Sequence, residues 1–495
     1  MPETDVFPLY TAAGVRELDR IAIEEQGIPG YTLICRAGQA LRDCIAANWP
    51  NCHHINILCG AGNNGADGYV LARLLREAGR DVSVQYFSDP GLLESDAATA
   101  FEDFKAGGGE ATAFEGELNT ATLQVDALLG TGLTRTVEGR WRQAIEKLNA
   151  QSAPVLAVDI PSGLAADTGV IQGIAVQAQR TLTFIGRKRG LYTAQGVDCV
   201  GVVEFSDLDV PAAVYDRQPV PACLLKRPAL GTLAAPRPRS SHKGDYGHVL
   251  VVGGGAGMPG APRLAAEAAA RCGAGLVSVA THADNTSGLN AGRWELMVHA
   301  VSHLNELAPL LQRASVVVVG PGLGQSRWSR QLFEQVLDTP LPLVVDADAL
   351  NLLARDPLIR QNWILTPHPG EAARLLGTET ATIQQDRFAA LEALRERYGG
   401  TIILKGAGTL IGDGRSLPAV CAAGNPGMAS GGMGDVLSGV LGALLAQGLT
   451  SGVAARAAVC LHAQAADRAA ATSGERGLLA ADLIPLVREG LNGGH

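Results

Sequence analysis

Aromatic residues make up only 4% of this 495-residue chain, and no run of apolar residues is long enough to cross a bilayer. Blocks of Lys and Arg are also missing, and the net charge is −9. Nucleic-acid-binding surfaces need clustered positive charge, so we expect neither a nucleic acid nor a membrane as a partner. The first five residues are acidic and lack the basic-then-apolar order of a signal peptide, which leads us to expect a cytoplasmic protein.

Paired cysteines are missing as well. The nine cysteines are irregularly spaced, and none forms a C-x2-C pair. A disulfide framework and a cysteine-bound metal are therefore both disfavoured. We expect reduced and mostly buried thiols.

The chain is instead rich in glycine, with 61 residues, and its hydrophobic content is 47%. This composition is typical of α/β sheets with many tight loops between strands and helices. A length of 495 residues suggests two or three domains. Strands and helices alternate on both sides of a proline-rich segment, so we predict an α/β protein with domains at 1–220 and 240–495 and a linker at 221–239.

Polar and glycine-rich loops follow four predicted strands of the first half. Ligands of parallel α/β sheets bind at the carboxyl ends of the strands. Four such loops at one edge favour a binding site. The loops are 60–68, 126–133, 159–164 and 186–190.

The second half repeats the alternation without a residue-level repeat. Strands are predicted at 248–252, 276–280, 316–319, 343–346, 363–365 and 401–404. A loop rich in Gly, Pro or Asp follows each of them, which again favours a site at the strand ends.

A further loop, 425–439, comes last in the chain. It runs from glycines into an apolar helix and carries one acid, Asp435. A helix start leaves backbone N–H groups unpaired and adds partial positive charge, which together bind an anion such as phosphate. A carboxylate beside a phosphate is explained if it takes the proton of an attacking hydroxyl. The stretch therefore indicates phosphoryl transfer to an alcohol, although a glycine turn that caps a structural helix has the same pattern.

Structural explanations remain open for most of the other candidate residues. An acid after a strand can cap a turn, a lysine can belong to a solvated basic patch or mark a strand end, a histidine between prolines can make one structural hydrogen bond, and a glutamate can favour the first turn of a helix. These alternatives apply to Asp126, Asp159, Lys188, Lys405, His368 and Glu371.

The motifs of the second half resemble those of the NAD(P)H-hydrate dehydratases. The resemblance covers 240–495 and rests on 241–244, 320–324, 366–371, 405–409 and the loop at 425–439. Residues 1–220 resemble NAD(P)H-hydrate epimerases through 62–65, Asp126 with 130–132, and 158–163. The fused order is similar to that of bifunctional repair enzymes of many bacteria. It implies a Rossmann-like α/β/α sandwich followed by a ribokinase-like α/β domain.

This resemblance implies the repair of hydrated nicotinamide cofactors. The substrates would be the C6 hydrates of NADH and NADPH. The first domain would epimerise their R and S forms. The second would phosphorylate the C6 hydroxyl of the S form and eliminate phosphate, using ADP (or ATP) and giving AMP and phosphate. We expect Mg²⁺ and K⁺ as further cofactors.

In the dehydratase half, the resemblance assigns Asp435 as the base. Glu371 would hold Mg²⁺ through water. Nucleotide contacts would come from Lys405, Gly406, Ala407, Gly408, Thr409 and Gly434, and hydrate contacts from Ala261, Gly322, Gly324, His368 and Asp435.

In the epimerase half, Asp159 is the first candidate for proton transfer and Lys188 the second. A potassium site would use Asn64, Asp126 and Ser162, whose oxygens suit a hard cation. Substrate contacts would come from Asn63, Asn64, Gly65, Ala66, Asp67, Gly130, Thr131, Gly132, Leu133, Thr134, Arg135, Thr136 and Asp159. The family usually has Gly where this chain has Ala66, and a methyl group fits there only if φ is negative.

Two other functions share part of this pattern. A ribokinase-like small-molecule kinase would use the same glycine loop and acid but would not need the first half. The first half could also be a non-catalytic binding module, although Asp159 and the complete loop at 63–65 argue against this. Helices of small residues are compatible with tight subunit packing, and we expect a homo-oligomer.

Overall fold

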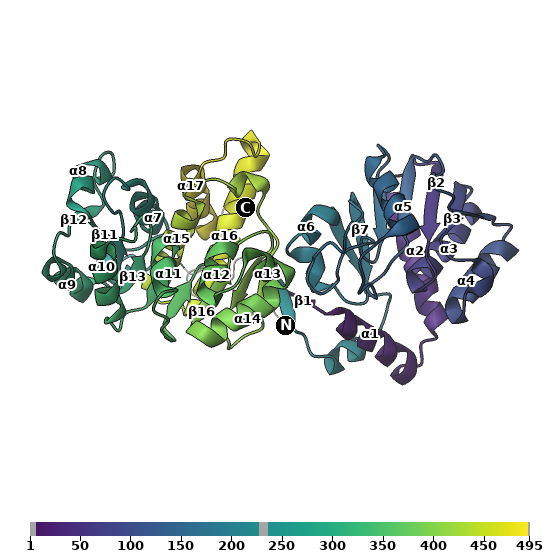
Figure 1. Cartoon of the computed structure of the whole chain (residues 1–495), viewed down its shortest axis with the longest axis horizontal. Helices are drawn as coiled ribbons and strands as arrows, with labels where there is room; N and C mark the ends of the chain where they lie inside the picture. The colour runs from purple at the N-terminus through teal and green to yellow at the C-terminus, as the bar shows by residue number, and fades with distance from the viewer. Residues whose placement is uncertain (1–5, 227–235, 494–495) are drawn as a thin grey trace. The chain divides into compact units, whose positions relative to one another are not determined.

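The computed structural model describes residues 6–226 and 236–493, which form two compact units. One unit is Pro8–Ala222, and the other contains the rest of the described chain. Both are α/β, as the sequence predicted (Figure 1). No helix of the described residues is both long enough and apolar enough to cross a membrane.

The first unit is built on a sheet of seven parallel strands in the order β4-β3-β2-β5-β6-β7-β8. Its central strands are buried on both faces and consist largely of Val, Leu and Ile, as parallel sheets require. The strands are β2 His54–Cys59, β3 Asp81–Tyr86, β4 Ala111–Ala113, β5 Leu123–Ala127, β6 Val155–Val158, β7 Arg180–Phe184 and β8 Val202–Ser206.

Helices cover both faces of this sheet and give the predicted α/β/α sandwich. The apolar sides of α2, α3 and α4 form one core with the sheet, and α5 forms a second core with the other face. The helices are α1 Ala12–Arg20, α2 Gly30–Asn48, α3 Asn63–Glu77, α4 Ser95–Ala106, α5 Gly139–Ala150 and α6 Gly196–Cys199.

The second unit has an eleven-stranded sheet in the order β1-β9-β18-β17-β16-β15-β14-β13-β10-β11-β12. The run from β16 to β12 is parallel, whereas β17 is antiparallel to both of its neighbours. The strands are β1 Val6–Leu9, β9 Ala222–Leu225, β10 His248–Val252, β11 Leu276–Thr281, β12 Met297–Ala300, β13 Val316–Val319, β14 Leu343–Val345, β15 Trp363–Leu365, β16 Thr401–Leu404, β17 Thr409–Gly412 and β18 Ala419–Cys421.

Helices α7 and α15 are in direct backbone contact over this sheet. A Cβ atom at Gly439 of α15 would lie 2.1 Å from the carbonyl oxygen of Ala265 of α7, so only glycine allows this approach. The helices of the unit are α7 Gly260–Arg271, α8 Thr286–Leu289, α9 Leu304–Arg313, α10 Arg327–Leu337, α11 Ala347–Leu353, α12 Pro369–Leu376, α13 Thr380–Gln385, α14 Arg387–Tyr398, α15 Met433–Ala446, α16 Ser451–Ser473 and α17 Ala480–Leu491.

The segment 221–239, predicted as a linker, contains strand β9, which pairs in parallel with β18 of the second sheet. Residues 227–235 of this segment lie outside the described residues. The prolines of the segment suggested an extended connection. We did not predict β9 because it is only four residues long and lies between two of these prolines. Other short strands that the pattern missed are β1, β4, β12, β17 and β18.

We expect Gly439→Val to destabilise the second unit by about 1–3 kcal/mol, because the side chain must push α15 away from α7. Calorimetric unfolding of the full chain measures this as a lower transition temperature. Gly288→Ala is the matched control, since a Cβ atom there meets nothing within 4 Å. A Gly439→Val transition as high as that of the control would contradict the tight contact.

Candidate active sites at the strand ends

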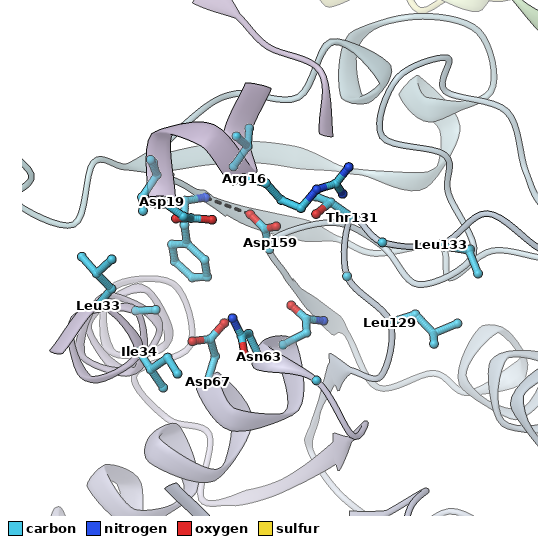
Figure 2. A pocket seen from close by; sticks show the side chains of 18 of the residues that line it. Arg16, Asp19, Leu33, Ile34, Asn63, Asp67, Leu129, Thr131, Leu133 and Asp159 are labelled. Atoms are coloured by element: carbon cyan, nitrogen blue, oxygen red, sulfur yellow. Dashed lines mark hydrogen bonds between the residues drawn. The ribbon is translucent and has the colours of Figure 1, made fainter. Parts of the chain in front are cut away.

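A cavity of about 670 Å³ lies in the first unit beside the loops that follow β2, β5, β6 and β7. Figure 2 shows the side chains that line it. Most of the predicted substrate contacts are among its lining residues, namely Asn63, Asn64, Asp67, Gly130, Thr131, Gly132, Leu133, Thr134, Arg135 and Asp159, together with Lys188. Thr136 lines a smaller neighbouring cavity with Arg135.

The loop that opens α3 is compact. A Cβ atom at Gly65 would lie 2.1 Å from the carbonyl oxygen of Gly60, so the loop can close only over a glycine. Ala66 lies in the first turn of α3, where its φ is negative and its N–H group donates to Gly62 O at 3.1 Å. The methyl group of Ala66 therefore fits the loop. The free N–H groups of a helix start can bind an anion here.

Asp159 and Lys188 form a buried ion pair at the cavity. Asp159 has a φ of +66°, a left-handed conformation that Asp tolerates better than most residues. Its Oδ1 accepts hydrogen bonds from Lys188 Nζ, from Phe184 N at 3.0 Å and from Thr183 Oγ1 at 3.2 Å. The Lys188 side chain is 0% exposed, which excludes the solvated basic patch left open by the sequence.

Asp126 lies behind the cavity and is fully buried. Its carboxylate accepts hydrogen bonds from Ser162 N at 2.8 Å, Ser162 Oγ at 2.6 Å and Leu128 N at 3.3 Å. Burial raises the pKa of Asp126 to about 6, and no cationic side chain of the described residues is among its partners. A buried carboxylate without a counter-charge fits a nearby cation.

Asn64 lies against the next loop. A Cβ atom at Gly130 would be 3.9 Å from Asn64 Oδ1, and Asn64 Nδ2 is buried without a hydrogen-bond partner among the described residues. The oxygens of Asn64, Asp126 and Ser162 suit K⁺. No cluster of three or more His, Cys, Asp or Glu side chains in the described chain is arranged to hold a metal ion.

Two more carboxyl groups face the same cavity. Asp67 extends from the first turns of α3 and Asp19 from α1 (Figure 2). Burial raises the pKa of Asp19 to about 6, and it raises the pKa of Asp67 well above the usual range. The sequence analysis did not identify Asp19, because an acid in an amphipathic helix ordinarily faces water.

A second charged cluster lies at the strand ends of the C-terminal unit. Lys405, after β16, donates to Asp346 Oδ1 at 2.8 Å, and Ser438 Oγ of α15 donates to Asp346 Oδ2 at 2.8 Å. Burial would raise the pKa of Asp346, but the Lys405 ammonium lowers it below the usual value. Burial would lower the pKa of Lys405, but Asp346 and Glu371 raise it. The pair is therefore charged.

Asp435 and Glu371 stand beside this pair. Burial and the nearby Asp346 carboxylate together raise the pKa of Asp435 to about 7, against the opposing effect of Lys405. Burial also raises the pKa of Glu371 to about 7, against the opposing effect of Lys405, whose Nζ lies 3.9 Å from Glu371 Oε2. Both groups change protonation near neutral pH, which suits proton transfer.

Glu371 and His368 cap the start of α12. Glu371 Oε2 accepts from His368 N at 2.8 Å, and His368 Nδ1 accepts from Gly370 N at 3.0 Å. Glu371 therefore does stabilise the first turn of a helix, which was one of the two explanations that the sequence left open. Its other oxygen, Oε1, lies 3.5 Å from His368 Nε2, and burial lowers the pKa of His368, which favours the neutral ring. A single carboxylate can hold Mg²⁺ together with water and phosphate oxygens.

The glycines of the site permit close backbone approach. A Cβ atom at Gly434 would lie 3.2 Å from Lys405 Nζ and 3.4 Å from Asp346 Oδ2. At Gly322 it would meet the side chain of Ala261 at 3.2 Å, which brings these two predicted hydrate contacts together. The N–H group of Gly324 donates to Asp348 Oδ2 at 2.8 Å.

The loop 406–409 is supported by Arg387, which the sequence analysis missed. Arg387 is buried, and its Nη2 donates to the carbonyl oxygens of Leu404 at 3.1 Å and Lys405 at 3.2 Å. Thr409 Oγ1 donates to Gly406 O at 2.9 Å. Gly406, Ala407, Gly408 and Thr409 thus follow directly on the charged cluster.

Two family models match the chain. Residues 249–488 match the model described as NAD(P)H-hydrate dehydratase, and residues 30–190 match the model described as YjeF-related protein N-terminus. These ranges contain the Asp159–Lys188 pair and the cluster around Asp346 and Lys405, whereas Asp19 lies before the first range.

Relatives named bifunctional repair enzymes align with nearly the whole chain. The bifunctional NAD(P)H-hydrate repair enzyme Nnr of Coxiella burnetii is 48% identical over 97% of this chain and 98% of its own length. The enzyme of the same name from Escherichia coli is 42% identical over 98% and 94%. A solved structure of the ADP/ATP-dependent NAD(P)H-hydrate dehydratase of Bacillus subtilis, co-crystallised with ATP and Mg²⁺, is 26% identical, covers 52% of this chain and 93% of its own, and has a TM-score of 0.46.

We expect Asp346→Asn to destabilise the C-terminal unit by about 3 kcal/mol at pH 7, because breaking a buried ion pair leaves the ammonium of Lys405 poorly compensated. Denaturant unfolding of the full chain measures the loss. Asp338→Asn, at an exposed position that ends α10, is the matched control. Equal midpoints for the two variants would refute a structural role for the pair.

Proposed function

Because the chain belongs to the family of bifunctional NAD(P)H-hydrate repair enzymes, we propose how its two sites divide the repair of hydrated nicotinamide cofactors. The protein epimerises the R and S hydrates of NADH and NADPH and dehydrates the S form back to the reduced cofactor at the expense of a nucleotide. The observation that carries this function is the alignment of full-length bifunctional relatives over nearly the whole chain.

We assign epimerisation to residues 1–220 and dehydration to residues 240–495, with 221–239 as the connection. The charged cavity with Asp159 supports the first assignment. The cluster around Asp346, Lys405 and Asp435 supports the second. Our preferred nucleotide is ADP, which would leave as AMP and phosphate.

In the dehydratase site, Asp435 is the base that takes the proton of the C6 hydroxyl as its oxygen attacks the terminal phosphoryl group of the nucleotide. Backbone N–H groups of Gly431–Gly434 stabilise the charge that develops on this group, and one such donor contributes about 2.7–4 kcal/mol. Phosphate then leaves C6 with the electron pair of the C6–O bond. A proton leaves C5, and the electron pair of that C–H bond restores the C5–C6 double bond. Nucleotide contacts come from Lys405–Thr409 and Gly434.

The remaining dehydratase residues bind and orient. Ala261, Gly322, Gly324 and His368 contact the hydrate, and Glu371 holds Mg²⁺ through water. The bound ion would neutralise charge on the nucleotide phosphates. A neutral His368 ring suits this place, because a protonated ring would be repelled by the Lys405 ammonium.

In the epimerase site, Asp159 takes and returns the proton of the C6 hydroxyl. The loops 63–67 and 130–136 bind the phosphates and sugars of the hydrate. Asn64, Asp126 and Ser162 hold K⁺, whose charge would balance the buried Asp126 carboxylate. We propose a cytoplasmic homo-oligomer as the working form.

The proposed function is tested by incubating the protein with a mixture of R and S hydrates, Mg²⁺, K⁺ and either ADP or ATP. Return of reduced-nicotinamide absorbance is followed. Recovery with two phases, the slower one limited by epimerisation, is the expected result. No recovery with either nucleotide would refute the function, and recovery with ATP alone would refute the preference for ADP.

We predict that Asp435→Asn lowers the rate of S-hydrate dehydration at least about 10²-fold, because a positioned base contributes about 10²–10⁴. The wild-type rate should rise with pH up to about 7, where Asp435 loses its proton. The variant should lack this rise.

Asp338→Asn serves again as the control, with a wild-type rate and pH profile. A rise near pH 7 that persists in Asp435→Asn would assign the titration to Glu371, and a wild-type rate in this variant would exclude Asp435 as the base.

We predict that Asp159→Ala repairs the S hydrate at the wild-type rate, because the dehydratase cluster is untouched. Its R hydrate should be repaired only as fast as it epimerises spontaneously. Separate progress curves with purified R and S hydrates measure both rates. Rapid R repair by the variant would show that Asp159 is dispensable.

A further inference from the structure

The side chain of Lys188 has no N–H group available to the substrate, because all of them are engaged in hydrogen bonds inside the protein. A lysine ammonium has three N–H donors. In Lys188 they are directed to Asp159 Oδ1, to Thr183 Oγ1 at 3.0 Å and to Phe184 O at 3.1 Å. A substrate atom could receive a proton from Lys188 only if one of these buried bonds broke. The arrangement instead holds the Asp159 carboxylate in place.

Asp67, unlike Lys188, has a side chain that is not engaged by other groups of the described protein. Its side chain is only 8% exposed, it lines the cavity, and within the described residues its carboxyl makes no hydrogen bond and no ion pair. A polar group that lines a cavity without a partner in the protein is available to a ligand. Figure 2 shows its carboxyl directed into the space below Asp159, where a ligand would lie.

The surroundings of Asp67 favour its neutral form. The titratable groups that face it are Asp19 of α1, Cys35 of α2, Cys59 of β2, and the pair Asp159 and Lys188. Three carboxyl groups therefore share one ammonium, which is bonded to Asp159. Burial, with the charges of Asp159 and Asp19, raises the pKa of Asp67 well above its usual range, and Lys188 opposes this only in part.

We propose that Asp67 is the general acid of epimerisation, that Asp159 is the base, and that Lys188 is a positioning residue for Asp159. The proposal rests on the epimerase function of this cavity. It places the acid and the base on two carboxyl groups with different surroundings in one site, which is how paired carboxyl groups divide these roles. The loop contacts to phosphate then come from the other residues of 63–67.

The step balances with these two groups alone. Asp159 takes the proton of the C6 hydroxyl, the electron pair of that O–H bond forms the carbonyl at C6, and the C6–N1 bond breaks. Its electron pair passes to N1, which takes the proton of Asp67. Rotation about C5–C6 turns the aldehyde. N1 then attacks its other face, returns its proton to Asp67, and the C6 oxygen regains the proton held by Asp159.

Asp67→Asn tests the acid, because the amide keeps the size of the side chain but has no proton to transfer. With the full chain, ADP, Mg²⁺ and purified R hydrate, we expect the repair rate to fall at least about 10²-fold while KM stays near the wild-type value. Purified S hydrate is the internal control and should be repaired at the wild-type rate. Asp43→Asn, at an exposed position of α2, is the matched control.

The pH profile separates chemistry from structure. Wild-type R repair, divided by S repair at each pH, should fall at high pH as Asp67 loses its proton, and the residual activity of Asp67→Asn should lack this fall. Lys188→Met should keep the fall but lower the rate of R repair at every pH, because Asp159 then loses a hydrogen-bond donor that holds it in place. Asp19→Asn should keep the fall.

Three results would overturn the assignment. They are R repair by Asp67→Asn at the wild-type rate, a raised KM with an unchanged pH profile, and loss of the high-pH fall in Asp19→Asn instead. Absence of R repair in the wild-type chain would contradict the epimerase function itself, which is a different outcome from any of these.

Discussion

Each unit depends on a lysine ammonium buried against a carboxylate at the ends of parallel strands. Lys188 pairs with Asp159 in one sheet, and Lys405 pairs with Asp346 in the other. Such charges are tolerated away from water only when they are paired and hydrogen-bonded. Both pairs satisfy this condition through neighbouring hydroxyl or backbone groups. They fix the polarity of the sites around them.

The two ion pairs differ in which neighbouring groups remain available to a substrate. In the first unit all three N–H groups of the ammonium make hydrogen bonds, and the chemistry that we propose uses the carboxyl groups around it. In the second unit Asp346 is bonded to both Lys405 and Ser438, and the uncommitted carboxyl is Asp435 at the start of α15. In each case burial, together with the nearby carboxylates, raises the pKa of a more loosely held acid. A stable scaffold and an acid with a raised pKa thus lie at the same site.

Much of this arrangement could be predicted from the sequence. The alternation of strands and helices located both sheets, and the glycine loops marked the strand ends where the candidate residues gather. Pairings between distant residues could not be predicted. Asp346 follows a strand in a position that also suits a helix cap, and nothing local indicates that Lys405 lies against it. Lys188 stands between two arginines, which suggests solvent, and only the fold shows its burial.

The contact between α7 and α15 also sets a distance. Gly439 touches Ala265, and both Asp435 and Ala261 lie four residues before their helix's contact residue, about one turn away. The separation between the base and a residue proposed to contact the substrate is therefore fixed by two backbones rather than by side-chain rotamers. A fixed distance of this kind would select among substrates by size. A substrate that contacts Ala261 would bring its hydroxyl to the Asp435 carboxylate only if the distance between these two parts of the substrate matched the spacing of the helices.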